Sequence, residues 1–149
     1  MATKVEQTIQ LDAAPDRVFK ALTDARELMN WFPSVVKNDP QTGGKLRYEW
    51  QFKESEKDGF QEGEYLEVVD GEKVVHTWDA SGVDTTVTFT VAAAGDGTEL
   101  HLVHEGWEAG MDEAAEMHGE IWGGYLQNLK GYLEQGQDMR SEMMGQITQ

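Results

Sequence analysis

The residues of this sequence best suited to acid–base or metal chemistry are its four histidines, two of which lie close together in the segment HLVH. The alternation of apolar and polar residues around His101 and His104 predicts a β-strand. Residues three apart on a strand point to opposite faces, so the two imidazoles cannot bind one ion together. His76 and His118 fall in other predicted elements, and cysteine is absent. We therefore expect no metal site and no cofactor.

His104 is the histidine with the clearest candidate role. It shares a predicted strand face with Leu100 and Leu102, which should point into the core. One interpretation is a core histidine that is hydrogen-bonded to a neighbour. The other is a polar group in an internal cavity that orients a bound molecule.

Nucleophilic catalysis has no support in the sequence. There is no Gly-x-Ser-x-Gly motif, no cysteine and no recognisable Ser–His–acid set. The segment GDGTE is typical of a hairpin turn and not of a phosphate-binding loop. Glu62 and Glu64 lie on a polar strand face, where charge is the default. Acid–base catalysis by His104 together with a tyrosine is the one enzymatic alternative that stays open.

The charge balance restricts the partners. The 149 residues include 28 Asp plus Glu and 12 Lys plus Arg, a formal net charge of −16. Such a surface repels phosphate backbones and anionic lipids, so we expect neither nucleic acid nor membrane as a partner. The excess of acidic residues indicates either a soluble surface whose charges repel one another or adaptation to a salt-rich (halophilic) cytoplasm. The opening MATKVEQTIQ lacks the apolar run of a secretory signal, so a cytoplasmic location is expected.

The elements that must position these residues follow a clear order. Residues 4–12 alternate as a strand, and residues 13–32 predict two short helices, with Asp24 capping the second and Pro33 ending it. Five further strands are predicted by period-two patterns and turn residues. They cover residues 45–52, 60–69, 73–79, 83–91 and 98–107, and a charged hairpin end occupies residues 53–59.

A long helix should close the chain, from about Asp112 to Glu134. Its apolar stripe recurs every three or four residues, although Gly123, Gly124 and Gly131 each cost up to about 1 kcal/mol relative to alanine in a helix interior. Packing must therefore hold this helix, and glycine would let a neighbouring backbone or a ligand approach it. Residues 137–149 should be frayed or extend the stripe.

Taken together, these elements predict an α+β fold in which a curved, antiparallel, six-stranded sheet wraps around the long helix. A sheet and helix held apart by large side chains commonly enclose a pocket. Aromatic residues on inward faces, with His104 and a helix leucine, are the candidate ligand contacts; a simple apolar core is the alternative. These residues are Tyr48, Trp50, Trp78, Phe89, His104, Trp122, Tyr125 and Leu129.

Several segments, in this order, resemble a known family. They are APDRVFKALTDARELMNWF, GEYLEVV before HTWD, LHLVHEGW, and HGEIWGGYLQNLKGYLE. Together they resemble the family named for the activator of the heat-shock protein 90 ATPase, within the START-like helix-grip (SRPBCC) superfamily. The resemblance implies a single helix-grip domain over residues 1–136, with a cavity between sheet and helix. Ile121 stands where the family usually has glycine, so a narrower cavity is expected there, and nothing carries over to residues 137–149.

Three functions follow as hypotheses. The first is a module that binds a small hydrophobic or aromatic molecule in the cavity. The second, implied by the family name alone, is a co-chaperone-like protein that stimulates a heat-shock protein 90 type ATPase. The third is a small cyclase or dehydratase, by analogy with other members of the superfamily. The identity of the ligand and the oligomeric state do not follow from the sequence.

Overall fold

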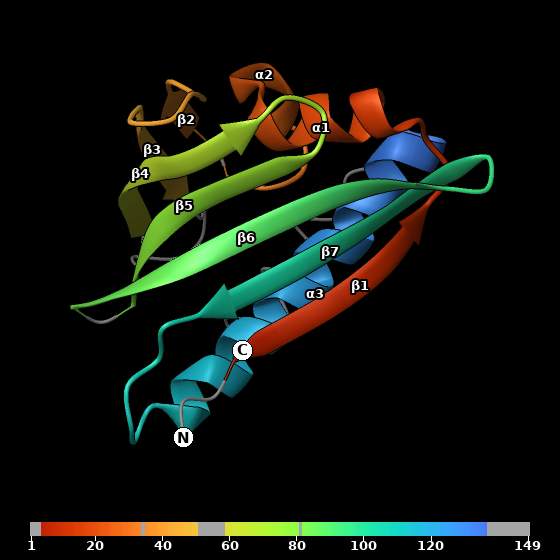
Figure 1. Ribbon diagram of the computed structural model, residues 1–149. Coiled ribbons are helices and arrows are strands. Elements are labelled where there is room, and N and C mark those ends of the chain that lie inside the picture. Colours follow the sequence, from red (N-terminus) through yellow and green to blue (C-terminus); the bar gives the residue numbers. More distant parts are fainter. Residues whose placement is uncertain (1–3, 34, 51–58, 81, 137–149) are drawn as a thin grey trace.

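The computed structural model describes residues 4–33, 35–50, 59–80 and 82–136, which form one large sheet and three helices (Figure 1). The fold is therefore α+β, as predicted. In chain order the elements are β1 (Val5–Leu11), α1 (Pro15–Thr23), α2 (Ala25–Leu28), β2 (Val35–Asn38), β3 (Lys45–Trp50), β4 (Gly59–Val69), β5 (Lys73–Ala80), β6 (Val83–Ala94), β7 (Gly97–Glu105) and α3 (Asp112–Gln135).

The sheet is antiparallel throughout, in the order β1-β7-β6-β5-β4-β3-β2. Strands β2 to β7 follow one another as a meander that begins at one edge of the sheet. Strand β1 forms the opposite edge and pairs with β7, where Val5 lies opposite His104. The connection between β1 and β2 carries α1 and α2 past the end of the sheet (Figure 1). This connection brings the residues that follow α2 against the C-terminal half of α3, where the Asn128 amide donates to the carbonyl of Trp31 at 2.9 Å.

Two predicted features are wrong in detail. The sheet has seven strands and not six, because Val35–Asn38 forms the edge strand β2 against β3. Four residues are too short to show a clear alternation in sequence. The second short helix also ends at Leu28 instead of continuing to Phe32, and Trp31 and Phe32 lie in the turns that follow it.

The alternation in β6 places its side chains as expected. Val87, Phe89 and Val91 are buried, while Thr86 and Thr88 face the partly exposed outer side. Thr85, two residues before Val87 on the same face, is also buried, and its hydroxyl contacts His104. All the buried apolar side chains of the described residues form one core between the sheet and the helices.

Helix α3 runs across the inner face of the sheet and packs along β1 (Figure 1). The Gln7 amide donates to the carbonyl of Gly119 at 2.7 Å, and the Lys130 ammonium donates to the carbonyl of Gln10 at 2.9 Å. Gly136, with φ of 67°, ends the helix in the left-handed conformation that suits glycine. These contacts fasten both halves of α3 to β1.

The glycines of α3 that face β1 are not crowded. A methyl group at Gly123 would meet the Gln7 side chain at 3.5 Å, and one at Gly119 would meet Val5 at 3.8 Å, which are ordinary contact distances. Close approach of α3 to β1 therefore does not require glycine at either position.

Gly123→Ala and Gly119→Ala should each raise the free energy of unfolding, by about 0.5–1 kcal/mol, because alanine loses less backbone entropy in a helix. Urea denaturation followed by circular dichroism measures this change. Gly97→Ala is the matched opposite case, since its methyl group would lie 2.4 Å from the Leu11 carbonyl oxygen. Loss of stability in the two α3 variants would contradict the packing described here.

Several predictions fall outside the described residues. These concern residues 51–58, which include the charged hairpin end, and the tail 137–149. Among the described residues, no helix combines the length and the apolar character needed to cross a bilayer.

Candidate functional site

One phenyl ring, that of Phe32, lies at the centre of the space between α3 and the sheet. Its centroid is 4.8 Å from that of Tyr125 and 5.2 Å from that of Trp122, both on α3. On the sheet side, Tyr48 of β3 lies at 5.3 Å and Trp78 of β5 at 6.3 Å. These distances are those of edge-to-face and stacked aromatic pairs. We call these five residues, together with Phe89 at 5.7 Å from Trp122, the aromatic cluster.

The structure brings most of the predicted contact residues together. Seven of the eight are buried: Tyr48, Trp78, Phe89, His104, Trp122, Tyr125 and Leu129. The side chain of Trp50 lies outside the described part of the chain. The half-buried Ile121 packs against the same core, on the flank where a narrower space was expected.

Phe32 is the residue that sequence reasoning missed as part of this set. The sequence showed it only as the last apolar residue before Pro33, at the end of a predicted helical stripe. Because α2 stops at Leu28, the chain turns inward and delivers Phe32 to the middle of the other rings. A large aromatic residue directly before a proline was the available signal, since that position disfavours helix.

His104 has both ring nitrogens engaged by the protein. The indole N–H of Trp122 donates to His104 Nδ1 at 3.0 Å, so Nδ1 accepts. Nε2 therefore carries the proton and donates to Thr85 Oγ1 at 2.7 Å, while the Thr85 hydroxyl donates to the carbonyl of Trp78 at 2.7 Å. The hydrogen-bond pattern assigns a neutral histidine with a single tautomer. Its effect is to hold the rings of Trp122 and the backbone of β5 in place.

The second buried histidine, His76, is also neutral, because burial disfavours its charged form. Burial lowers the pKa of His76 to about 4, partly opposed by the carbonyl of Thr77. Burial also lowers the pKa of His104 to about 3, and the neighbouring His118 and His76 lower it further. A group that titrates near pH 3 is a poor general base at neutral pH. This geometry does not favour the cyclase or dehydratase hypothesis.

The hydroxyls of Tyr48 and Tyr65, on β3 and β4, are also hydrogen-bonded and uncharged. Tyr48 and Tyr65 are hydrogen-bonded to one another, and burial raises the pKa of Tyr48 well above 10. The Asn38 amide donates to the Tyr65 hydroxyl at 3.0 Å and to the carbonyl of Thr23 at 2.7 Å. The interior around the aromatic cluster therefore combines apolar rings with neutral polar groups.

Within the described ranges, no group of three or more His, Asp or Glu side chains is arranged to hold a metal ion. A hollow of about 390 Å³ lies at the surface between α1, Pro40 and the turn at Asp70 and Gly71. It shares no residue with the aromatic cluster.

The sequence profile described as "Activator of Hsp90 ATPase homolog 1-like protein" matches residues 12–134. The chain belongs to this family. The match spans the aromatic cluster and its hydrogen-bonded support, from Phe32 to Leu129, and confirms the resemblance noted from the sequence segments. No match is found among the curated proteins.

Solved structures agree with the assignment of the family fold. The Aha1 dimer from Colwellia psychrerythraea aligns with a TM-score of 0.76 at 19% identity, covering 91% of this chain and 98% of that one. Protein CV1439 from Chromobacterium violaceum aligns with a TM-score of 0.76 at 29% identity, covering 88% and 96%. CalU16 from Micromonospora echinospora aligns with a TM-score of 0.72 at 24% identity, covering 98% and 85%. This member of the activator family therefore has a helix-grip-like fold.

Proposed function

We propose that this protein binds a small, uncharged, apolar or aromatic molecule between the sheet and α3. The observation that carries the proposal is the environment of Phe32. Rings from β3, β5 and α3 surround one phenyl group, so the same position would suit the aromatic ring of a ligand. The family match and the helix-grip-like fold are consistent with this kind of module.

The chemistry of the interior supports the choice of ligand class. Burying about 200 Å² of apolar surface supplies about 5 kcal/mol before ordering costs, and ring contacts add to it. The neutral His104 and the protonated tyrosines offer no charge to balance an ion, and an unpaired buried charge is costly. An acidic or basic ligand is therefore disfavoured.

His104 contributes to this binding mode through Trp122. We call the position among the rings of the aromatic cluster, which Phe32 fills, the ring site. The imidazole of His104 fixes the plane of the Trp122 indole, which forms one side of this site. Both nitrogens of His104 are already hydrogen-bonded, so it has no further nitrogen to offer a ligand. His104 is thus a hydrogen-bonded core histidine that acts on ligand binding indirectly, by positioning Trp122.

A screen of uncharged aromatic and hydrophobic metabolites by thermal shift and native mass spectrometry tests the proposal. At a ligand concentration 100 times Kd, we expect about 2.7 kcal/mol of stabilisation, which is a Tm rise of about 5–10 °C for a chain of this size. Tyr125→Leu should reduce the shift because it removes one ring of the cluster. The matched control is Phe60→Ala, because Phe60 is exposed on β4. Equal shifts in Tyr125→Leu and wild type, or no binding by any compound, would contradict the proposal.

The family description supports a second candidate function, stimulation of a heat-shock protein 90 type ATPase. The net charge of −16 would require a basic surface on that partner. A rise in the ATPase rate of the host's own chaperone on addition of this protein would favour this function.

A further inference from the structure

The position of Phe32 depends on residues 29–33, which follow α2 and belong to no helix or strand. Trp31, the residue before Phe32, is held in place by two hydrogen bonds, one through its side chain and one through its backbone. The Trp31 indole donates to the carbonyl of Ala21 on α1 at 2.9 Å, and the Asn128 amide on α3 donates to the carbonyl of Trp31 at 2.9 Å. The ring of Phe32 is thus presented inward by contacts to two different helices.

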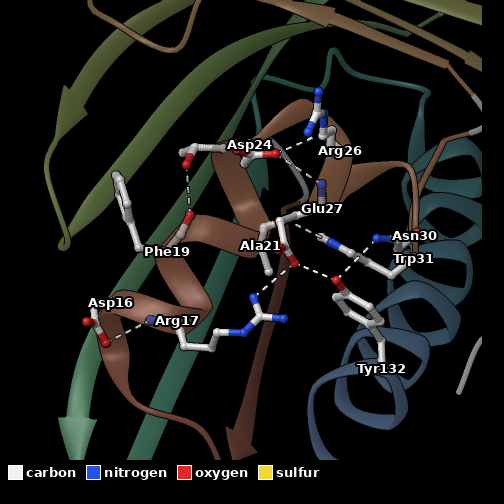
Figure 2. A network of polar contacts seen from close by, with 11 residues as sticks. Asp16, Arg17, Phe19, Ala21, Asp24, Arg26, Glu27, Asn30, Trp31 and Tyr132 are labelled. Carbon is white, nitrogen blue, oxygen red and sulfur yellow. Dashed lines mark hydrogen bonds and ion pairs between the residues drawn. The ribbon is translucent and has the colours of Figure 1, made fainter. Parts of the chain in front are cut away.

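A polar clamp at the solvent edge holds the same segment from outside (Figure 2). Glu27 Oε1 on α2 accepts from Arg17 on α1 at 2.9 Å and from the Tyr132 hydroxyl on α3 at 2.5 Å. The Asn30 amide donates to the Tyr132 hydroxyl at 3.2 Å. We call Arg17, Glu27, Asn30 and Tyr132 the elbow clamp. It joins all three helices around the segment that carries Phe32.

The clamp and the cluster differ in how easily they open. The side chain of Arg17 is 41% exposed and that of Glu27 is 18% exposed, so water competes for these contacts. Phe32 itself is buried, but its partners are rings that would contact an incoming ring equally well. Loss of the clamp contacts therefore favours release of the segment without removing what binds a ligand.

We propose that Phe32 is the specificity-determining residue of the ring site, acting as an internal competitor that a ligand displaces, and that the elbow clamp sets how often it yields. This inference rests on the function proposed above. It names the ligand class more closely: an uncharged molecule with a one- or two-ring aromatic group, since it must replace a single phenyl ring. The apparent Kd equals the intrinsic Kd divided by the fraction of molecules with Phe32 displaced.

The decisive variant is Tyr132→Phe, which keeps the ring of Tyr132 and removes its hydroxyl from Glu27 and Asn30. The population with Phe32 displaced should rise about five- to tenfold, and the apparent Kd for the neutral two-ring probe 1-naphthylamine should fall by the same factor. The association rate should rise in parallel. The matched control is Glu67→Gln, which removes an exposed contact of 2.7 Å to Lys73, away from the clamp.

Phe32→Ala separates the internal competitor from an ordinary wall residue. If the ring competes, Phe32→Ala binds indole and the naphthylamine probe more tightly than wild type, and adding Tyr132→Phe gives no further gain. Phe32→Leu serves the same comparison if the alanine variant does not fold. Probe binding with the same Kd in wild type and Tyr132→Phe, or weaker binding in Phe32→Ala, would overturn this inference and leave the binding function intact. No binding in wild type or in either Phe32 variant would overturn the binding function itself.

Discussion

Replacing His104 by alanine should lower the free energy of unfolding by about 4 kcal/mol. The change leaves the Trp122 indole N–H buried without its acceptor, which costs about 1–3 kcal/mol. It also opens a cavity beside Trp78, Trp107 and Trp122, with a further cost of about 2–3 kcal/mol. Urea denaturation at pH 7.5, followed by circular dichroism, measures the difference.

The matched control for this variant is His101→Ala on the same strand. His101 lies on the outer face, where its ring contacts the exposed Glu6, so its removal should change stability by less than about 1 kcal/mol. A similar small loss for His104→Ala, accompanied by weaker ligand binding, would show that the imidazole serves a ligand and not the interior network.

Acidification from pH 7.5 to pH 5.0 should lower the free energy of unfolding by about 4 kcal/mol through His76 and His104. Both pKa values are depressed, to about 4 and about 3, so the folded state stays unprotonated in this range. The unfolded chain takes up a proton on each ring near pH 6.5, and stability therefore falls as the pH drops through that value. Each histidine contributes about 2 kcal/mol by pH 5.0.

Urea denaturation at half-unit pH steps tests this dependence. The slope should reach about 2.5 kcal/mol per pH unit near pH 5.5, and His76→Gln should reduce it by about half. Glu6 and Glu134, whose pKa values are lowered mainly by hydrogen bonds to His101 and Lys130, add a loss of the same sign at lower pH. A stability that stays flat down to pH 5.0 would mean that the buried rings accept protons in the folded state.

The two predictions bear on the proposed function because the same histidines support the ring site. His104 fixes Trp122, and His76 lies 6.0 Å from Tyr48 and 6.4 Å from Trp78 between ring centroids. Protonation of either ring would place a charge beside the aromatic cluster. Because the folded protein keeps both rings neutral down to about pH 5.0, binding of an uncharged aromatic molecule by the folded protein should weaken only below that pH.

Local periodicity was enough to predict most of the fold. The alternation of Val87, Phe89 and Val91 with threonines predicted the buried face of β6, and the three-four spacing in residues 112–134 predicted α3. Both patterns arise within one element, since a strand or helix repeats its buried side at a constant interval. The strand β2 was missed because four residues at a sheet edge carry too little of such a pattern.

What only the tertiary structure decided is which inward residues meet. Sequence identified Tyr48, Trp78, Trp122 and Tyr125 as inward, but not the ring of Phe32 among them. Likewise, the single tautomer of His104 depends on Thr85 and Trp122, which come from a neighbouring strand and from α3. The physical reason is that the periodic pattern of apolar residues predicts only which face of a helix or strand is buried. Contacts between elements depend on strand register, on how the helix crosses the sheet and on the turn that follows α2. The sequence by itself thus determined the sheet, the long helix and their buried faces, and only packing in three dimensions brought the rings together around Phe32 and joined the three helices through the elbow clamp.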